Sequence, residues 1–344
     1  LKSESLAGFE LECMADFIGI RITRLLTERR RKVRVLLRKT SDQSALHGLP
    51  VEITYGDVLH PPSLSMAMQG CETVFYSVVD PRFWLTDQTP IFRNNVEGLV
   101  NAMDAALKAG VKRFIFTSTM GTLGLNPNGR VSEDIPFNWL DRAPPYIRAR
   151  LEAETRLLSY CREKGLPGIA LCVANTYGPQ DYQPTPHNGG LWEVASGRTK
   201  VAIDVSQPTV DIRDVAMAAL SAETQGRLGE RYIIANEFVS NRTLFAMAAA
   251  CGNQPPPKFI PYGVSYGIAW ITERLMKLAG RKDFMISANA MFLSNVFREM
   301  DNTKARTELD WRPRPLAETV RDCIEWLADR ERQGRAVHAS GEKA

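Results

Sequence analysis

The chain has few histidines and cysteines for its length, and neither type is spaced as a metal site requires. Four histidines and six cysteines occur in 344 residues. The sequence contains no Cys-x-x-Cys pair, and no cysteine has a neighbouring histidine that could share a metal ion. Zinc sites normally show such spacing. We therefore expect no metal centre, and we expect free thiols in a reducing compartment.

Long apolar runs and a large net charge are also absent. No stretch approaches about 18 uninterrupted apolar residues, so the sequence predicts no membrane span. The acidic N-terminal segment does not resemble a signal peptide. The formal charge is only +4, with Lys and Arg spread along the chain, which argues against a nucleic-acid partner. We expect a cytoplasmic protein whose partner is a small-molecule substrate.

Segments with strand character alternate with helical patterns through the first half of the chain. Short β-branched and aliphatic runs lie at 33–37, 51–55, 74–79, 112–117 and 168–173. Helical periodicity covers 18–28, 95–109 and 146–163. This alternation predicts an α/β fold, with a doubly wound parallel sheet covered by helices on both faces.

Tyr146 and Arg150 stand four residues apart in a segment with no helix breaker after Pro145. In a helix their side chains share one face. A nearby cation favours the phenolate, so we expect Arg150 to lower the pKa of Tyr146 from about 10 toward neutral. The pair therefore predicts a general acid or base. The alternative is an ordinary pair on an amphipathic helix.

The segment Tyr146 to Glu154 resembles the Tyr-x-x-Ser-Lys-x-x-Ala-Glu run of extended short-chain dehydrogenases/reductases, the NAD-dependent epimerase/dehydratase family. Ala149 and Arg150 take the serine and lysine positions. Further segments match the family in order: Asn95-Val96-Glu97-Gly98, Phe116 to Gly121, Tyr177-Gly178-Pro179 and Asp211 to Ala216. The segments 80–84, 122–125 and 184–186 look most like its dihydroflavonol-reductase-like and 3β-hydroxysteroid-dehydrogenase-like branch.

This resemblance implies a Rossmann-type fold with a smaller C-terminal substrate domain. The dinucleotide-binding-type domain is expected over 1–178, with 205–236 returning to its sheet. The substrate domain is expected over 179–204 and 237–335, followed by a tail over 336–344. Because the family usually dimerises through two long helices, here 95–109 and 146–163, the resemblance also implies a homodimer.

The family's catalytic residues map onto four positions. The resemblance implies that Tyr146 transfers a proton and that Arg150 lowers its pKa and holds the nicotinamide ribose. It implies that Thr119 hydrogen-bonds the substrate oxygen and that Asn95 supports the proton relay. An arginine in place of lysine keeps the charge but brings a longer, planar donor.

The glycine-rich turn that binds the cofactor diphosphate in this family falls on residues 12–19, where only Gly19 is retained. Cys13 adds a Cβ in the turn, and Asp16 places a carboxylate beside the expected phosphates. Residues 9–12 would then form the central first strand, although Glu10 and Glu12 are unusual there. These departures oppose binding of NAD or NADP.

Six residues are expected at the cofactor: Phe17, Ile18, Gly19, Arg38, Asp57 and Val78. Arg38 suits the 2′-phosphate of NADP, unless it is simply a solvated arginine. Asp57 resembles the residue that contacts the adenine amino group, although Gly-Asp is also an ordinary turn. Arg30 replaces the glycine that usually closes the first helix.

The substrate pocket is expected to include Trp84, Asn175, Tyr182 and Trp192, although aromatic residues often just form core. The segment 263–278 has an amphipathic pattern that predicts a helix. Three roles are open for this helix: to cap such a pocket, to contact a membrane surface, or to pack against the rest of the protein. The expected function is an NAD- or NADP-dependent oxidoreductase that transfers hydride between the nicotinamide and a carbonyl or secondary alcohol of a hydrophobic, cyclic substrate. Two alternatives stay open: a degenerate ligand-binding or scaffold protein without dinucleotide, and non-redox elimination or hydrolysis in the same pocket.

Overall fold

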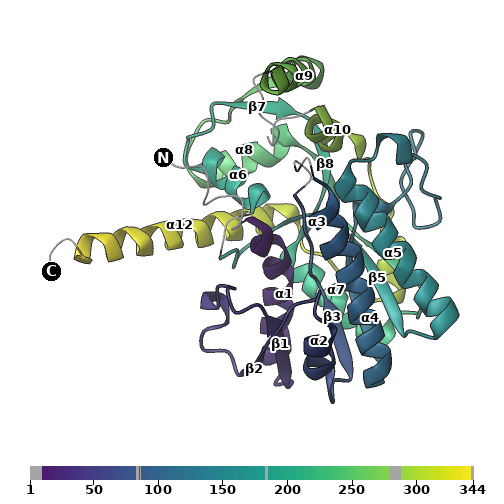
Figure 1. Ribbon diagram of the computed structural model, residues 1–344. Coiled ribbons are helices and arrows are strands. Elements are labelled where there is room, and N and C mark those ends of the chain that lie inside the picture. The colour runs from purple at the N-terminus through teal and green to yellow at the C-terminus, as the bar shows by residue number, and fades with distance from the viewer. Residues whose placement is uncertain (1–9, 83–84, 86, 183–184, 279–287, 342–344) are drawn as a thin grey trace.

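The computed structural model describes residues 10–82, 85, 87–182, 185–278 and 288–341. Its main layer is a parallel sheet in the order β3-β4-β5-β9. The strands are Thr73–Tyr76, Arg113–Thr119, Gly168–Val173 and Arg231–Ile234. Every residue of β5 is buried, as in a central strand with helices over both faces. The predicted doubly wound α/β architecture is confirmed (Figure 1).

Two layers of helices cover this sheet. They consist of α1 (Glu10–Glu28), α2 (Pro61–Met68), α4 (Gly98–Ala109), α5 (Pro145–Lys164) and α7 (Ile212–Gln225). Phe114 and Phe116 of β4 pack with α2, α4 and α5. Ile115, between them, packs with α1 and α7. Because successive strand residues point to opposite faces, one strand serves both cores.

A second parallel pair, β1 (Val33–Leu37) and β2 (Val51–Tyr55), is separate from the main sheet. Leu36 packs against the core under α2 and α4, and Val33 packs against the core under α1. The β1 strand therefore lies in the same layer as the main sheet. No described strand pairs with β1 on the side away from β2, and all five β1 residues are partly exposed.

The prediction of a central first strand over 9–12 is wrong for residues 10–12, which begin α1; residue 9 lies outside the described residues. Glu, Leu, Met and Ala are good helix formers, and carboxylates are unfavourable in a buried central strand. The helix α1 therefore continues without a break through residues 12–19, where the glycine turn was expected. The predicted helix over 18–28 is confirmed.

The rest of the chain builds a smaller unit with its own core. Its strands are β6 (Asn175–Tyr177), β7 (Val201–Asp204), β8 (Ser206–Asp211), β10 (Glu237–Ser240) and β11 (Lys258–Pro261). Its helices are α6 (Pro186–Ala195), α8 (Asn241–Cys251), α9 (Tyr262–Leu278), α10 (Ala288–Val296) and α12 (Leu316–Gly341). The β8 strand lies between β10 and β6, and β7 pairs with β11. Apolar residues of α6, α8 and α12 form the core of this unit.

Two short helices, α3 (Thr89–Phe92) and α11 (Thr303–Glu308), complete the described fold. The far end of α12 extends beyond the other elements (Figure 1). No helix in the described part of the chain combines the length and apolar character that crossing a membrane requires. The domain boundaries remain a prediction; β9 pairs with β5, whereas β8 pairs with β6 and β10.

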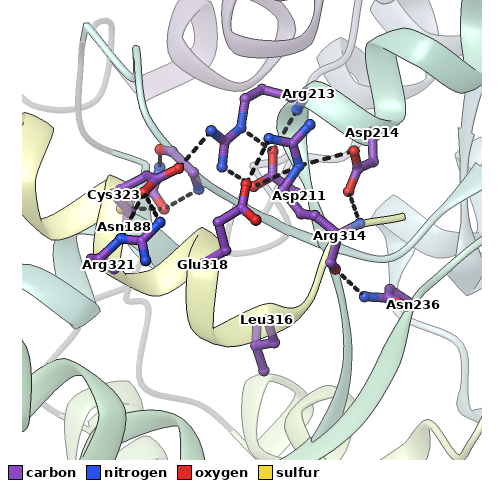
Figure 2. A network of polar contacts seen from close by, with 12 residues as sticks. Asn188, Asp211, Arg213, Asp214, Asn236, Arg314, Leu316, Glu318, Arg321 and Cys323 are labelled. Atoms are coloured by element: carbon purple, nitrogen blue, oxygen red, sulfur yellow. Dashed lines mark hydrogen bonds and ion pairs between the residues drawn. The ribbon is translucent and has the colours of Figure 1, made fainter. Parts of the chain in front are cut away.

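A network of charged residues fastens α12 to α7 (Figure 2). Asp211 caps α7 by accepting from the Arg213 amide at 2.7 Å. The Arg213 guanidinium pairs with Asp211 and with Asp322 of α12, both at 2.7 Å. Arg314, just before α12, pairs with Asp214 at 3.0 Å. The segment Asp211 to Ala216 therefore joins the two units of the fold.

Candidate functional site

Tyr146 lies in the first turn of α5, where Pro145 occupies an early helical position. Proline is favoured there because its missing N–H would have no helical partner. Tyr146 is partly buried beside apolar residues from three segments of the chain: Leu125, Phe137, Trp139, Phe292, Leu293 and Phe297. Its phenol therefore faces a mainly aromatic and aliphatic environment.

Thr119 lies at the carboxyl end of β4 and contacts Tyr146 through a side-chain hydrogen bond. Its Oγ1 also accepts from the Gly121 amide at 3.2 Å, which caps the short turn Met120–Thr122. A Cβ at Gly121 would collide with Ile147 of α5. Glycine at this position lets the end of β4 approach the first turn of α5 closely, which brings Thr119 beside Tyr146.

The pKa of Tyr146 lies above its ordinary value. Burial raises it, while the Arg150 charge and the Thr119 hydrogen bond lower it by less. Desolvation disfavours a charged phenolate more strongly than one cation at this distance favours it. The prediction that Arg150 brings this pKa toward neutral is therefore wrong in its net direction for the protein without ligand, although the contribution of Arg150 has the expected sign.

Arg150 lies one turn after Tyr146 and is only 2% exposed. Its Nη1 donates to Asn95 Oδ1 at 3.3 Å, and its Nη2 donates to the carbonyl oxygen of Thr117. The guanidinium carbon lies 4.7 Å from the centre of the Phe116 ring. Among the described residues, the buried side-chain atoms without a hydrogen-bond partner include Arg150 Nε and the Tyr76 hydroxyl, together with Arg21 Nε and Arg24 Nε. Buried polar groups without a protein partner often mark the position of a ligand or water.

Asn95 is fully buried in one turn of π-helix, Arg93–Glu97, that precedes α4. Its Nδ2 donates to the carbonyl oxygens of Asp80 and Ile91, each at 2.9 Å. Its Oδ1 accepts from the Asp80 amide as well as from Arg150. Such π-turns often occur at functional sites because they redirect one side chain. Asn95 therefore connects Arg150 to the segment that follows β3.

Asp80 is a buried carboxylate that the sequence analysis did not assign to the site. Arg82 donates to it at 2.8 Å and Asn94 at 2.8 Å. Burial raises the pKa of Asp80, but these hydrogen bonds outweigh that effect and leave the pKa below its usual range. A charged Asp80 thus lies beside Asn95. Its position directly after the third predicted strand was the available signal.

Glu154 is a second buried carboxylate without an assigned role in the sequence analysis. It lies one turn after Arg150 on α5 and is 2% exposed. It accepts from Ser118 and from Thr122, the latter at 2.8 Å, and pairs with Arg231 of β9 at 3.1 Å. Glu154 therefore fixes the residues on either side of Thr119 and connects α5 to two strands.

The residues expected at the cofactor diphosphate lie in α1. Phe17 is buried, and Ile18 packs against the core that α1 covers. Gly19 lies inside the helix, where an added Cβ would be 2.9 Å from Ser77 Oγ. This glycine allows α1 to approach the segment after β3 closely. It does not form a turn.

The other three expected cofactor residues follow strands. Arg38 is exposed after β1. Asp57 follows β2, and its Oδ1 accepts from the Leu59 amide at 2.8 Å, a contact typical of an ordinary turn. Val78 follows β3 and packs against the core under α2 and α4. All three stand near the carboxyl ends of parallel strands, where doubly wound folds bind ligands.

A dinucleotide therefore fits one part of this arrangement and not the other. Tyr146, Thr119 and the partner-free Arg150 Nε suit the nicotinamide end. The continuous helix α1 provides no glycine turn at residues 12–19 for the diphosphate.

The expected pocket residues are not gathered around Tyr146 in the described contacts. Trp84 lies outside the described residues. Asn175 donates to Gln207 at 2.6 Å, and Trp192 packs against the core of α6, α8 and α12. The Tyr182 hydroxyl accepts from Arg24 at 2.6 Å, and its ring meets Trp326 edge-on.

A cavity of about 400 Å³ opens beside the first turn of α5. It is lined by Gln88, Asp141, Arg142, Ala143, Pro144, Pro145, Arg148, Tyr266 and Phe292. Pro145 is adjacent to Tyr146 in the chain, and Phe292 belongs to the apolar group around Tyr146. This cavity is therefore adjacent to Tyr146 along the chain.

The model of the NAD-dependent epimerase/dehydratase family matches residues 14–235. The chain belongs to this family. Membership confirms the resemblance to extended short-chain dehydrogenases/reductases and indicates NAD- or NADP-dependent oxidoreductase, epimerase or dehydratase chemistry.

Two relatives match about nine tenths of the chain. Sterol demethylase protein B of Methylococcus capsulatus is 27% identical over 315 residues, covering 91% of this chain and 96% of its own. A putative dihydroflavonol 4-reductase of Synechocystis sp. is 26% identical and covers 90% and 92%. The crystal structure of gox2253 superposes with a TM-score of 0.82 at 30% identity, covering 92% of this chain and 97% of that chain.

Proposed function

We propose that this chain is an NAD- or NADP-dependent oxidoreductase that interconverts a carbonyl and a secondary alcohol on a hydrophobic, cyclic substrate. The bound nicotinamide would supply or accept the hydride. Tyr146 exchanges the proton with the substrate oxygen, and Thr119 hydrogen-bonds that oxygen. Arg150 supports the phenolate and contacts the ribose, while Asn95 holds Arg150 in place.

One observation carries this proposal. The phenol of Tyr146 is hydrogen-bonded to Thr119. Arg150 lies one turn away on the same helix and donates hydrogen bonds to Asn95 and Thr117. The apolar group around Tyr146, which includes Trp139, supports a hydrophobic substrate. The names of the relatives, a sterol demethylase protein and a dihydroflavonol reductase, agree with a cyclic substrate.

A second candidate is favoured by the continuous helix α1. Without a glycine turn, the same pocket would bind its ligand without dinucleotide, as a ligand-binding or scaffold protein, or would catalyse elimination or hydrolysis with Tyr146 and Arg150 stabilising an oxyanion. Product analysis with and without added coenzyme separates these outcomes from the redox reaction.

Replacement of Tyr146 tests the proposal. A panel of 3β-hydroxysteroids and dihydroflavonols is assayed with NAD(H) and NADP(H) by coenzyme absorbance. Tyr146→Phe should lower kcat by about 10²- to 10⁴-fold, the usual contribution of a positioned acid or base. Tyr160→Phe is the matched control, because that hydroxyl lies on the same helix and contacts Asp104, at 3.2 Å, and Lys164, both away from the candidate site. Normal turnover of Tyr146→Phe would refute the assignment.

A further inference from the structure

The helix α9 presents an apolar stripe to solvent. Val264, Ile268, Ile271 and Leu275 are 53%, 53%, 54% and 61% exposed. Their spacing of four, three and four residues aligns them along one face of the helix. Exposed apolar side chains are common singly, but a contiguous row of this kind marks an interaction surface.

The opposite face of α9 is already occupied. Ser265 and Ala269 are buried at 8% and 1% exposure. The helix contacts α10, β7 and β11 on this side. In Figure 1, α9 lies at the outer edge of the molecule, at the end opposite β1 and β2. The apolar stripe is therefore the outward face of a helix that the fold holds at its margin.

The composition of the exposed face favours a lipid surface over a paired helix. Besides the stripe it carries Tyr266 and Trp270, which are 38% and 44% exposed. With 3.6 residues per turn, the exposed side chains of α9 occupy an arc of about 200° around the helix axis. Tyr266 lies at one edge of this arc and Ile268 at the other. A coiled-coil seam is narrower and is flanked by pairing charges of both signs. Tyrosine and tryptophan at the rim are typical of helices that lie in a membrane interface.

The exposed charge on this face is cationic, and the one carboxylate between residues 263 and 275, Glu273, is partly buried. Arg274 is the only charged residue among the exposed positions of 263–275, all of which the structure describes, and it lies 4.0 Å from the Trp270 ring centre. Near the cavity, the exposed Arg142 lies 4.1 Å from the Phe292 ring centre, beside Arg148 and one carboxylate, Asp141. Anionic lipid headgroups complement this arrangement.

The α9 face reaches the cavity beside the first turn of α5. Tyr266 of α9 lines the same cavity as Pro145 and Arg148 of α5. Leu140, next to the cavity residue Asp141, is 54% exposed. Tyr266 and Phe292 thus connect the α9 face to a cavity whose other lining residues include the charged Asp141, Arg142 and Arg148.

We propose that α9 docks this protein on a lipid surface, with Val264, Ile268, Ile271 and Leu275 entering the interface and the cavity mouth facing the lipid. A water-insoluble cyclic substrate would then enter the site from the bilayer. That second step depends on the proposed function, whereas docking itself does not.

Vesicle co-sedimentation of the whole chain tests docking. The vesicles are phosphatidylcholine, alone or with phosphatidylglycerol, and neither coenzyme nor substrate is present. The wild type should bind, and bind more with phosphatidylglycerol. The double variant Ile268→Ser/Ile271→Ser should lose roughly tenfold or more in partitioning, because two apolar side chains no longer enter the interface. Since both residues are exposed, these changes leave the folded core intact.

Leu228→Ser is the matched control, because Leu228 is 51% exposed outside α9 and should not affect binding. Tyr146→Phe should bind vesicles as the wild type does, which separates docking from catalysis. Equal partitioning of the wild type and the double variant, or no binding at vesicle excess, would overturn the proposal. The proposal would also be overturned if the wild type did not bind vesicles and were a dimer in sedimentation velocity, while the double variant were a monomer. That result would assign the stripe to contact with a second copy of the chain.

Discussion

The Arg150 guanidinium and the Asn95 side chain are direct hydrogen-bond partners, with Nη1 3.3 Å from Oδ1. The same guanidinium bonds the Thr117 carbonyl at the end of β4. A planar, forked donor can bridge two acceptors, whereas a compact ammonium on a shorter stem reaches fewer of them. Arginine in this position therefore connects α5, β4 and the turn before α4 on one side of the site.

Replacement of Arg150 should separate its charge from its shape. Arg150→Met should reduce kcat by about 10²-fold or more, because the phenolate of Tyr146 loses its cation. Arg150→Lys should retain more activity than Arg150→Met. In the oxidation direction Tyr146 must act as phenolate, so the rising limb of the pH–kcat profile should move to higher pH in Arg150→Met.

Arg156→Met, an exposed change on the same helix, is the control for Arg150. It should leave both kcat and the pH profile unchanged. If Arg150→Met had the wild-type pH profile, Arg150 would not act on Tyr146, and its role would be structural only.

Glu154 should contribute strongly to stability because it is buried and pairs with Arg231. Glu154→Gln should lower the free energy of unfolding by about 2–4 kcal/mol, since it removes the carboxylate that pairs with the partly buried Arg231 guanidinium. Glu152→Gln, on the exposed side of the same helix, should change it by less than about 0.5 kcal/mol. Urea denaturation measures both values; equal effects of the two variants would contradict the account.

Asp181 should make stability depend on pH. Burial raises the pKa of Asp181 from 3.8 to about 6, despite hydrogen bonds from Thr185 and Asn188. A carboxyl whose pKa is higher in the folded state favours folding below about pH 4, and this contribution is lost as pH rises through 6. Asp181→Asn should therefore gain stability relative to wild type across that window, by roughly 3 kcal/mol at most.

The exposed change Asp310→Asn serves as the comparison for Asp181, because the Asp310 side chain is 72% exposed. The effect of Asp310→Asn on the free energy of unfolding should be constant between pH 4 and 6, whereas the effect of Asp181→Asn should change over this range. A constant difference between Asp181→Asn and wild type over this range would show that Asp181 does not titrate there.

Arg30 follows the last residue of α1, Glu28, by two positions and has a left-handed conformation, with φ of 58°. Glycine takes this conformation without steric strain and often closes helices. Arg30→Gly should therefore raise the melting temperature, because removal of about 1–2 kcal/mol of left-handed strain exceeds the entropy cost of glycine in the unfolded chain. Arg29→Gly, at a neighbouring position without positive φ, should lower it or leave it unchanged. Thermal unfolding followed by circular dichroism measures both, and a destabilised Arg30→Gly would be the contrary result.

Local patterns predicted the sheet and helices wherever they were strong. The apolar runs at 33–37, 51–55 and 168–173 are strands, and Tyr146 and Arg150 lie one turn apart on α5. The predicted N-terminal strand is wrong because the prediction followed the alignment with the family and not the helix preference of the residues present. Glu10 and Glu12 favour a helix that can expose carboxylates over a strand buried on both sides.

The polar contacts of the site could not be read from local patterns. Glu154 and Arg231 are 77 residues apart in the chain, and Asn95 and Arg150 are 55 apart. The net pKa of Tyr146 depends on how completely neighbouring segments exclude water, which the spacing of Tyr146 and Arg150 does not reveal. The stripe on α9 was visible as an amphipathic pattern, but only the fold shows which face meets solvent.

The most direct test is calorimetric titration of the wild type with NADPH and NADH, compared with Arg150→Met. We expect saturable heat at or below millimolar coenzyme, equivalent to a binding free energy of about −4 kcal/mol or better, and weaker binding by Arg150→Met. Absence of any heat with either coenzyme at millimolar concentration would contradict the redox assignment and leave only the fold and its pocket.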